Sequence, residues 1–550
     1  MIDHIIERLS EVKGIDQLIL ATGPKEENED LARQVHSYGI KTFFDDDVND
    51  VTGRIARAGE CFKAGFIVTV SGDCPLIDPE FIQRGIALLK DSEADFVYVD
   101  HLKYKCLHEG IEFHTKENWE TLDELSSTWY HKEHPGSVLK EGNHSFRGAE
   151  ITPRVEFQRH DFRMSVDTRS DLFFMNQIYQ ELSSDDKIVD LHDVLNLIDK
   201  KPWLKKINDH VHQKEVEEKS KTFLFITQAS PEIGMGHLSR CIALATEIQE
   251  SYGAKTIFYL NSDEIALTIL KQQGFIVSLE SQLGPKTDIL AIVQMNKISR
   301  IIVDIKPDIL YSRFDFLPRM YSPIVLIDIL PEGEFSGIPS VIPAVNLDRQ
   351  ARPKNVYRGK KYLILKREIQ FWGDAQNDVK PDQILVLSGG SSIPKSQIIK
   401  SLEIFENNVT IKFIIGPFAN REWLESELND TDIFNYNISQ SPEQIFSDIK
   451  KAYLVLTPFG VTAYECLAIG TPTVITSIVN PDDQDIIEYL EQENILVNVL
   501  ENSNSAEQMG RNIYKLYSDP EKCESLSEKA RANIQADGVK NVANIIVSNI

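Results

Sequence analysis

The stretch that decides the fold is residues 230–245, SPEIGMGHLSRCIALA, which follows the short apolar run 222–227. An apolar run, a glycine-bearing turn and an amphipathic stretch predict a strand, a loop and a helix in that order. Gly234, Gly236 and His237 then lie at a helix N-terminus, where free N–H groups favour a phosphate or carboxylate and a histidine can accept a proton from water. The same spacing also suits a simple turn capped by His237, so the residues alone leave both interpretations open.

The composition is that of a large globular protein. A length of 550 residues allows three or four units of about 150 residues each. A net charge of −26 argues against a protein that coats nucleic acid or binds an anionic membrane, although a nucleotide can still be a ligand. The six cysteines are scattered without a CxxC pair, which predicts reduced thiols. No apolar run approaches the ~20 residues of a membrane span, so we expect a cytoplasmic protein.

The N-terminal third alternates helical patterns with strand-like runs at residues 17–22, 66–71 and 96–99. This alternation predicts a mostly parallel sheet covered by helices, with ligands beyond the carboxyl ends of its strands. Asp73 and Asp167 each follow a short strand-like run, so the two carboxylates could share a Mg²⁺ that bridges to nucleotide phosphates. Equally, Asp73 could form a turn and Asp167 could cap a helix.

Ordered landmarks make this region resemble the spore-coat-polysaccharide type of cytidylyltransferase, which is related to the enzymes that make CMP-sialic acid and CMP-Kdo. The matching pieces are DVTGR at 50–54, SGDCPLID at 71–78, GIE at 110–112, KEH at 132–134 and SVDTRSD at 165–171. The resemblance implies transfer of CMP from CTP to a sugar acid, with Asp73 and Asp167 holding Mg²⁺. It also implies that Arg54 and Glu112 bind substrate. The family opens with a basic glycine loop that precedes the first landmark, and this sequence begins after it. Either the sequence is a truncated version of a longer protein, or the domain has lost activity and serves as a scaffold or sugar-binding module; of the two, we expect impaired cytidylyl transfer.

The remaining sequence predicts the domain organisation. Residues 205–221, KKINDHVHQKEVEEKSK, have no apolar face and predict a solvated linker. Beyond it the α/β rhythm restarts twice, which predicts doubly wound domains at 222–375 and 376–550 with a hinge at 371–381. The expected strands are 223–226, 256–260, 275–279, 300–303, 324–327, 384–387, 411–415, 452–456 and 473–475. The fold class is therefore α/β: a nucleotidyltransferase-like (GT-A-like) domain at 1–204, then a GT-B pair.

Two glycine-bearing turns in the last domain follow expected strands and can hold a nucleotide. Their candidate residues are Gly389, Gly390, Ser391, Gly460, Thr462 and Glu465. The first three can present amides to a diphosphate. In the second turn, the Thr462 hydroxyl can meet phosphate and Glu465 can accept both hydroxyls of a ribose. The spacing of Thr462 and Glu465 also satisfies a capping box.

From residue 222 onward the sequence resembles the UDP-sugar hydrolase of pseudaminic-acid biosynthesis and, more distantly, the MurG-type glycosyltransferases. The matching pieces are GMGHLSRC at 234–241, Val303-Asp304, YLILKRE at 362–368, SGGS at 388–391, and Gly460 to Pro472. The resemblance implies that His237 activates water against the anomeric carbon of a UDP-linked sugar, without a cofactor. It adds Arg240 and Gln484 to the substrate-binding residues. Where the family carries charges before the glycines, this sequence has Ile226 and Gln228.

Three hypotheses follow. The leading one is a nonulosonic-acid (sialic-acid-like) or surface-polysaccharide enzyme that fuses a UDP-sugar hydrolase-like part to a cytidylyltransferase-like part. Its ligands would be a UDP-sugar, with CTP and a sugar acid at the first domain. The second is a GT-B glycosyltransferase, in which the sugar passes to an acceptor instead of water. The third is a non-catalytic scaffold that binds nucleotide sugars.

Overall fold

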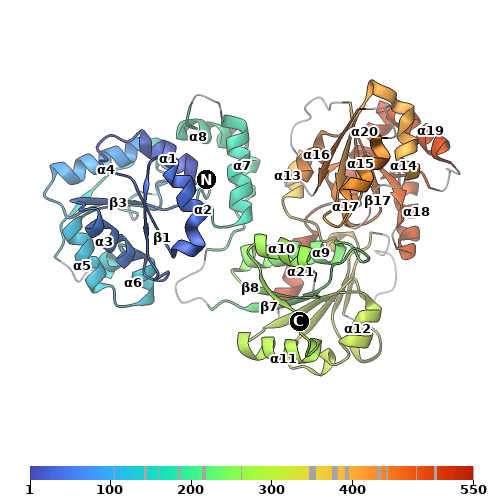
Figure 1. The fold of residues 1–550 in the computed structure, drawn as a ribbon, viewed down its shortest axis with the longest axis horizontal. Coiled ribbons are helices and arrows are strands. Elements are labelled where there is room, and N and C mark those ends of the chain that lie inside the picture. The colour runs from blue at the N-terminus through green and yellow to red at the C-terminus, as the bar shows by residue number, and fades with distance from the viewer. Residues whose placement is uncertain are drawn as a thin grey trace. The chain divides into compact units, whose positions relative to one another are not determined.

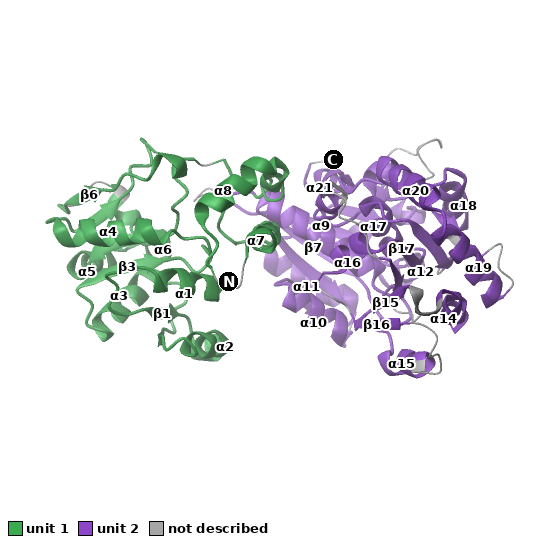
Figure 2. Ribbon diagram, turned by 90° about the horizontal axis from the view of Figure 1, so that it is seen from above, with its two compact units in different colours: residues 1–211 green, residues 212–550 purple. Residues whose placement is uncertain are grey.

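The structure, a computed structural model, describes residues 1–104, 106–141, 145–159, 161–183, 187–213, 219–261, 263–345, 355–374, 382–390, 396–429, 435–440, 444–478, 480–500 and 505–548. The chain divides into two compact units, residues 1–211 and 212–550 (Figure 2). Among the described residues, no helix is both long and apolar enough to cross a membrane.

Unit 1 contains two sheets among its described residues. Strands β1 (Ile19–Thr22) and β2 (Lys41–Phe44) pair in parallel. A second sheet has the order β3-β5-β4-β6, formed by β3 (Phe66–Val70), β4 (Phe96–Tyr98), β5 (Ile111–Thr115) and β6 (Gly148–Glu150). Strand β5 runs antiparallel to both of its neighbours. The expectation of a mostly parallel sheet is therefore wrong for this sheet, because β5 is a return strand that the spacing of apolar runs did not reveal.

Helices cover these sheets. They are α1 (Ile2–Ser10), α2 (Lys25–His36), α3 (Val51–Cys61), α4 (Pro79–Asp91), α5 (Lys116–Leu125), α6 (Trp129–Glu133), α7 (Arg169–Leu182) and α8 (Leu191–Lys200). The core of the unit includes Ile82 and Phe113, which are 0% and 2% exposed. Helix α4 can lie close to β5 because Gly85 leaves room, since a Cβ there would lie 2.3 Å from the Phe113 ring.

The predicted linker is partly packed. Ile207 and Asn208 are buried, and the Asn208 amide donates a hydrogen bond to Asp171 at 2.9 Å. The expectation of a fully solvated segment is wrong for these two residues, since an apolar side chain and a paired amide compensate for their charged neighbours. The division between the two units lies just beyond them, after Val211.

The first sheet of unit 2 has the order β13-β12-β11-β10-β7-β8-β9, and all of its pairings are parallel. Its strands are β7 (Thr222–Thr227), β8 (Lys255–Leu260), β9 (Ile276–Leu279), β10 (Arg300–Asp304), β11 (Ile324–Ile327), β12 (Ser340–Ile342) and β13 (Val356–Arg358). The associated helices are α9 (Gly236–Tyr252), α10 (Glu264–Gln272), α11 (Pro285–Asn296) and α12 (Pro307–Arg313). The strand, loop and helix expected around residues 222–245 are confirmed.

The second sheet of unit 2 has the order β16-β15-β14-β17-β18-β19, again parallel throughout. Its strands are β14 (Gln383–Leu387), β15 (Thr410–Ile415), β16 (Asn435–Gln440), β17 (Leu454–Pro458), β18 (Thr473–Ser477) and β19 (Val497–Asn498). Its helices include α13 (Ile369–Asp374), α14 (Ser396–Ser401), α15 (Arg421–Asn429), α16 (Ile445–Lys451), α17 (Val461–Ile469), α18 (Gln484–Gln492), α19 (Ala506–Tyr517) and α20 (Pro520–Asn533). Two parallel sheets with helices confirm the expected pair of doubly wound folds (Figure 1).

The segment between the two sheets belongs to both cores. Tyr362 and Ile364 pack into the core of the first sheet, whereas Leu363 and Leu365 pack into the core of the second. This alternation is what an extended chain produces, because successive side chains point in opposite directions. The expected hinge at 371–381 lies largely outside the described residues.

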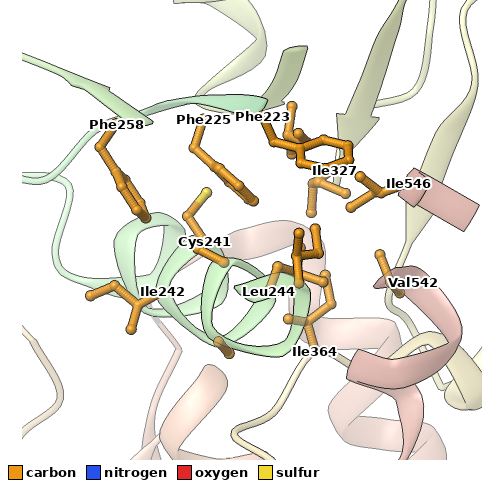
Figure 3. Packing of buried hydrophobic residues seen from close by; sticks show 14 of the residues in the cluster. Phe223, Phe225, Cys241, Ile242, Leu244, Phe258, Ile327, Ile364, Val542 and Ile546 are labelled. Carbon is orange, nitrogen blue, oxygen red and sulfur yellow. The ribbon is translucent and has the colours of Figure 1, made fainter. Parts of the chain in front are cut away.

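The last helix, α21 (Gly538–Val547), lies on the first sheet rather than the second. Val542 and Ile546 pack in the same cluster as Phe223 of β7 and Leu244 of α9 (Figure 3). From the sequence this helix is expected to belong to the domain at 376–550. The apolar face of α21 would suit either sheet. The hydrophobic pattern alone therefore did not reveal that the chain returns from the second sheet to the first.

Candidate functional site

His237 lies in the first turn of α9 and contacts Asp304 at the end of β10. Its Nδ1 lies 2.6 Å from Asp304 Oδ1, so Nδ1–H donates to the carboxylate. Nε2 is then the ring nitrogen that keeps a lone pair for accepting a proton. Gly234 helps to position His237 at this point. Its φ of 80°, a conformation that glycine adopts readily, lets the loop after β7 turn sharply into α9.

Arg240, one helical turn further on, joins two carboxylates. Its Nε and Nη2 donate to the two oxygens of Asp304 at 2.9 and 2.7 Å. Its Nη1 lies 3.0 Å from Oδ2 of Asp328, which follows β11. Arg240 is expected from the sequence to bind substrate, but its guanidinium lies against protein carboxylates, with 12% of the side chain exposed.

Asp304 is fully buried and ionised within this network. Burial opposes its charge, but Arg240 and His237 outweigh burial and lower the pKa of the carboxyl below its ordinary value. A charged acceptor is therefore in place to orient the imidazole and to stabilise the imidazolium formed when Nε2 takes a proton. Ile226 and Gln228 carry no charge at this edge. The carboxylates near His237 instead belong to Asp304, at the end of β10, and Asp328, which follows β11.

The glycine turn after β14 lies against the start of α9. A Cβ at Gly390 would lie 2.6 Å from the backbone nitrogen of Met235, so only glycine fits this contact. Gly389 has a φ of 73°. The carboxyl edges of the two sheets of unit 2 therefore meet at this point. Ser391, the third candidate of the turn, lies outside the described residues.

Helix α17 begins directly after Gly460, which puts Thr462 in its first turn. The helix has no side-chain cap at Gly460, so Thr462 and Glu465 do not form the capping box that their spacing allowed. Partial burial raises the pKa of Glu465 to about 7, against an opposing effect of Lys366. Gln484 begins α18, and its amide donates to Glu488 at 2.9 Å.

Tyr464 connects the two halves of this site. The residue is 9% exposed. Burial raises its pKa, and the charges of Asp483 and Asp328 act in the same direction. Because Asp328 follows a strand of the first sheet and Tyr464 lies in α17, which packs against α9, the edge that carries His237 lies near the helix that carries Thr462 and Glu465.

In unit 1 the structure brings the Asp73 and Asp167 segments together. The backbone N–H of Val166 donates to the carbonyl oxygen of Asp73 at 2.8 Å. Burial raises the pKa of Asp167, and the charge of Asp73 adds to that effect, while Arg163 opposes it. Arg163 forms an ion pair with Asp167 and another with Asp171 at 3.0 Å.

Asp171 is the structural residue of this loop. It is fully buried and accepts hydrogen bonds from the backbone of Asp167 and Thr168 at 3.2 and 3.0 Å. The Thr168 hydroxyl in turn accepts a hydrogen bond from the backbone N–H of Asp171, which completes a capping box at the start of α7. These bonds fix the backbone of Asp167 at the start of α7.

Arg54 and Glu112 lie on different elements of unit 1. Arg54, in the first turn of α3, donates to the carbonyl oxygens of Asp47 and Val48 at 3.3 Å each. Glu112, on β5, has a buried Oε2 without a hydrogen bond and lies 3.6 Å from His114. Among the described residues, the hydrogen bonds and ion pairs of Arg54 and Glu112 do not reach Asp73 or Asp167.

The carboxylate oxygens of Asp73 and Asp167 are ligands of the kind that Mg²⁺ prefers. Magnesium is usually held by one or two carboxylates together with substrate phosphates, and the charge of Asp73, which helps to raise the pKa of Asp167, indicates that the two carboxylates act on each other. The described residues contain no group of three or more histidine, cysteine or acidic side chains able to hold an ion alone. A metal here would therefore depend on ligand oxygens.

Sequence reasoning placed Asp304 at a strand end but did not give it a role, and it did not assign Asp328 or Tyr464 to the site. Asp304 and Asp328 both follow apolar strands, which is the signal that could have found them. Their shared partner, Arg240, comes from a distant helix, so the network becomes visible only in the fold.

Comparison with known proteins agrees with this two-part organisation. Residues 1–219 match the sequence model of the family described as cytidylyltransferase. The uncharacterized protein MJ1063 of Methanocaldococcus jannaschii is 28% identical over 40% of this chain and 88% of its own length. The spore coat polysaccharide biosynthesis protein SpsF of Bacillus subtilis is 20% identical over 37% of this chain and 84% of its own length.

A further relative extends beyond unit 1. The spore coat polysaccharide biosynthesis protein SpsG of Bacillus subtilis is 25% identical over 45% of this chain and 74% of its own length. That share of the chain exceeds the 211 residues of unit 1. The crystal structure of Acinetobacter baumannii MurG covers 60% of this chain and 99% of its own, with 13% identity and a TM-score of 0.45. The chain therefore combines a cytidylyltransferase-like part, residues 1–219, with a second α/β part of two parallel sheets.

Proposed function

We propose that unit 2 cleaves the bond between the sugar and UDP in a UDP-sugar, with water as the nucleophile. The observation that carries this proposal is the His237–Asp304 pair, which leaves Nε2 of the imidazole as a base. The pair lies where the edges of the two sheets meet, as the contact of Gly390 with Met235 shows. A base next to amide-rich glycine turns is what hydrolysis of a sugar diphosphate requires.

The reaction would proceed in one displacement. His237 Nε2 takes a proton from water while the water oxygen bonds to the anomeric carbon. The bond between that carbon and the phosphate oxygen breaks, and its electron pair leaves with UDP. Amides of the turns at Gly389 and Gly460 would neutralise the growing charge on the phosphate. Glu465 would hold the ribose hydroxyls.

The experiment is to incubate the full chain with a panel of UDP-sugars and to follow UDP and free sugar separately. Release of both products without an acceptor, reduced at least a hundredfold in His237→Ala, supports hydrolysis. The matched control is His212→Ala, an exposed histidine of the same unit. Turnover by His237→Ala at the wild-type rate would contradict the assignment of the base.

Sugar transfer is the second candidate, since the same base can activate the hydroxyl of an acceptor. The observation that favours it is the resemblance to SpsG, a protein of spore coat polysaccharide biosynthesis. In the same assay, UDP release that requires an added acceptor and gives no free sugar would select transfer over hydrolysis.

For unit 1 we propose binding of CTP with Mg²⁺ at Asp73 and Asp167, and transfer of CMP to a sugar acid, although the sequence alone predicts that this transfer is impaired. The match of residues 1–219 to cytidylyltransferases and the hydrogen bond that joins the segments of the two aspartates support this proposal. Mg²⁺ would neutralise phosphate charge there, while Arg163 and Ser165 orient Asp167. The two activities would serve one route to a surface polysaccharide, in line with the similarity to both SpsF and SpsG.

The test for unit 1 is pyrophosphate release from CTP in the presence of sialic acid or Kdo. Asp73→Asn should abolish release, and Asp78→Ala, which removes the cap of α4 instead, should lower stability without a matching loss of turnover. Binding of CTP without pyrophosphate release would leave unit 1 as a nucleotide-binding module and contradict the transfer step.

A further inference from the structure

Asp328 is the carboxylate of the His237 network that solvent reaches. Its side chain is 42% exposed, whereas that of Asp304 is 0% exposed. It follows β11 directly, next to β10 in the sheet, and so lies at the carboxyl edge where parallel sheets bind ligands. Oδ2 is occupied by Arg240 at 3.0 Å. The other oxygen is therefore the part of this side chain that can meet a ligand.

The backbone of Asp328 is strained, and the strain does not come from the end of a helix. Its φ is 59°, a region that costs energy for residues other than glycine. The other described non-glycine residues with a positive φ are Lys63, Lys297, Asn355 and Asn494. Lys63, Lys297 and Asn494 lie just beyond the end of a helix, whereas Asn355 directly precedes β13. Asp328 instead follows a strand, with its N–H bonded to the Val341 carbonyl oxygen at 2.8 Å. Strain of this kind persists mainly at functional sites.

Arg240 does not compete for the same role. Its Nε, Nη1 and Nη2 each contact a carboxylate of Asp304 or Asp328. The groups that the first sheet offers to a ligand at this edge therefore include the base on His237 and the acceptor on Asp328. The nucleotide candidates Thr462 and Glu465 lie in α17, on the second sheet.

We propose that Asp328 accepts a hydrogen bond from a hydroxyl or amide N–H of the sugar ring in the bound UDP-sugar, while Arg240 holds the carboxylate in place. This inference rests on the proposed function of unit 2 and assigns the sugar-side contact within it. Asp328 thus distinguishes the nucleotide sugar from the free nucleotide, because UDP alone lacks the sugar ring whose hydroxyl or amide N–H donates this hydrogen bond.

The test uses two variants of the full chain. Asp328→Asn keeps an oxygen for Arg240 and tolerates the left-handed backbone, and Asp328→Gly removes the side chain without strain. Asp308→Asn, an exposed aspartate of α12, is the matched control. Calorimetry with UDP and with UDP-N-acetylglucosamine gives both affinities, and thermal unfolding confirms that each variant is folded.

We expect both Asp328 variants to bind UDP-N-acetylglucosamine about tenfold or more weakly, as loss of a charged hydrogen bond predicts, with UDP affinity unchanged. Equal losses for both ligands, or no loss for the sugar nucleotide, would overturn the inference and leave the proposed hydrolysis intact. A selective loss without UDP release by the wild type would keep the contact but overturn the hydrolysis. Failure of the wild type to bind either ligand would overturn both.

Discussion

At the scale of single residues, Asp304 accepts hydrogen bonds from His237 and Arg240 in a place that solvent does not reach. In Asp304→Asn, Arg240 loses a buried ionic partner, which typically costs about 3–5 kcal/mol. We expect urea unfolding to show a loss of roughly 3 kcal/mol, because Asp328 still pairs with Arg240. We also expect UDP release to fall about a hundredfold, since the imidazole loses its charged orienting partner.

The control for this prediction is Arg240→Lys, which keeps the positive charge but cannot donate to both oxygens of Asp304 at once. Its stability should lie between those of the wild type and Asp304→Asn. An Asp304→Asn protein with unchanged stability and turnover would show that the network has no role.

The raised pKa of Glu465 predicts that the stability of the protein depends on pH. Its pKa is about 7 in the folded protein, raised by burial from an ordinary value of 4.5. The folded state therefore binds the proton more tightly than the unfolded state, and the contribution of this group to stability falls as pH rises from 4.5 to 7. Glu465→Gln should remove that slope, measured as unfolding free energy between pH 4.5 and 8.

The matched control is Glu493→Gln, an exposed glutamate just beyond α18, which should leave the wild-type pH profile in place. A Glu465→Gln protein whose profile parallels the wild type across this range would contradict the raised pKa.

The residue scale also shows how far sequence patterns reach. His237 could be placed at a helix N-terminus because the strand, glycines and helix are local signals. Its partner Asp304 lies 67 residues away, and the contact depends on β7 and β10 being neighbours in the sheet. The identity of an acidic residue at a strand end was visible, but the group that it contacts was not.

At the scale of elements, a buried cation binds the C-terminal end of α21. Arg300, at the start of β10, donates through Nη1 to the carbonyl oxygens of Ile545, Ile546 and Ser548 at 3.1, 2.5 and 3.0 Å. These carbonyls lie at the C-terminal end of the helix, where a positive charge is favourable. In Arg300→Met we expect amide exchange in residues 538–547 to accelerate about thirtyfold or more, for a loss of roughly 2 kcal/mol.

Lys221→Ala is the control for this prediction. Lys221 also reaches a carbonyl oxygen of α21, that of Val547 at 3.3 Å, but it does so at the surface, where such a contact contributes little. Equal exchange rates in α21 for the Arg300→Met and wild-type proteins would show that apolar packing alone holds the helix.

Elements differed in how well the sequence predicted them. Strands β7, β10 and β11 are almost wholly apolar and buried, so their runs were clear. Strand β16, NYNISQ, alternates exposed and half-buried residues, and β19 has two residues; neither was expected. Short or polar strands form because a neighbouring strand offers hydrogen bonds, and that information is not local.

At the scale of the whole molecule, each core cluster of the described residues lies within one unit. The cluster around Ile82 and Phe113 belongs to unit 1, and the clusters around β7 and β14 belong to unit 2. We therefore expect two unfolding transitions in calorimetry. UDP at about a hundred times its dissociation constant should stabilise unit 2 by about 2.7 kcal/mol, raising that transition by several degrees and leaving the other in place.

CTP with Mg²⁺ provides the complementary measurement, since it should raise the transition that UDP does not move. Residues 212–550 expressed alone should reproduce the UDP-sensitive transition at the temperature seen in the full chain. A single transition that both ligands move together would show that the two units unfold as one, and it would contradict the view that each unit is stabilised by its own core.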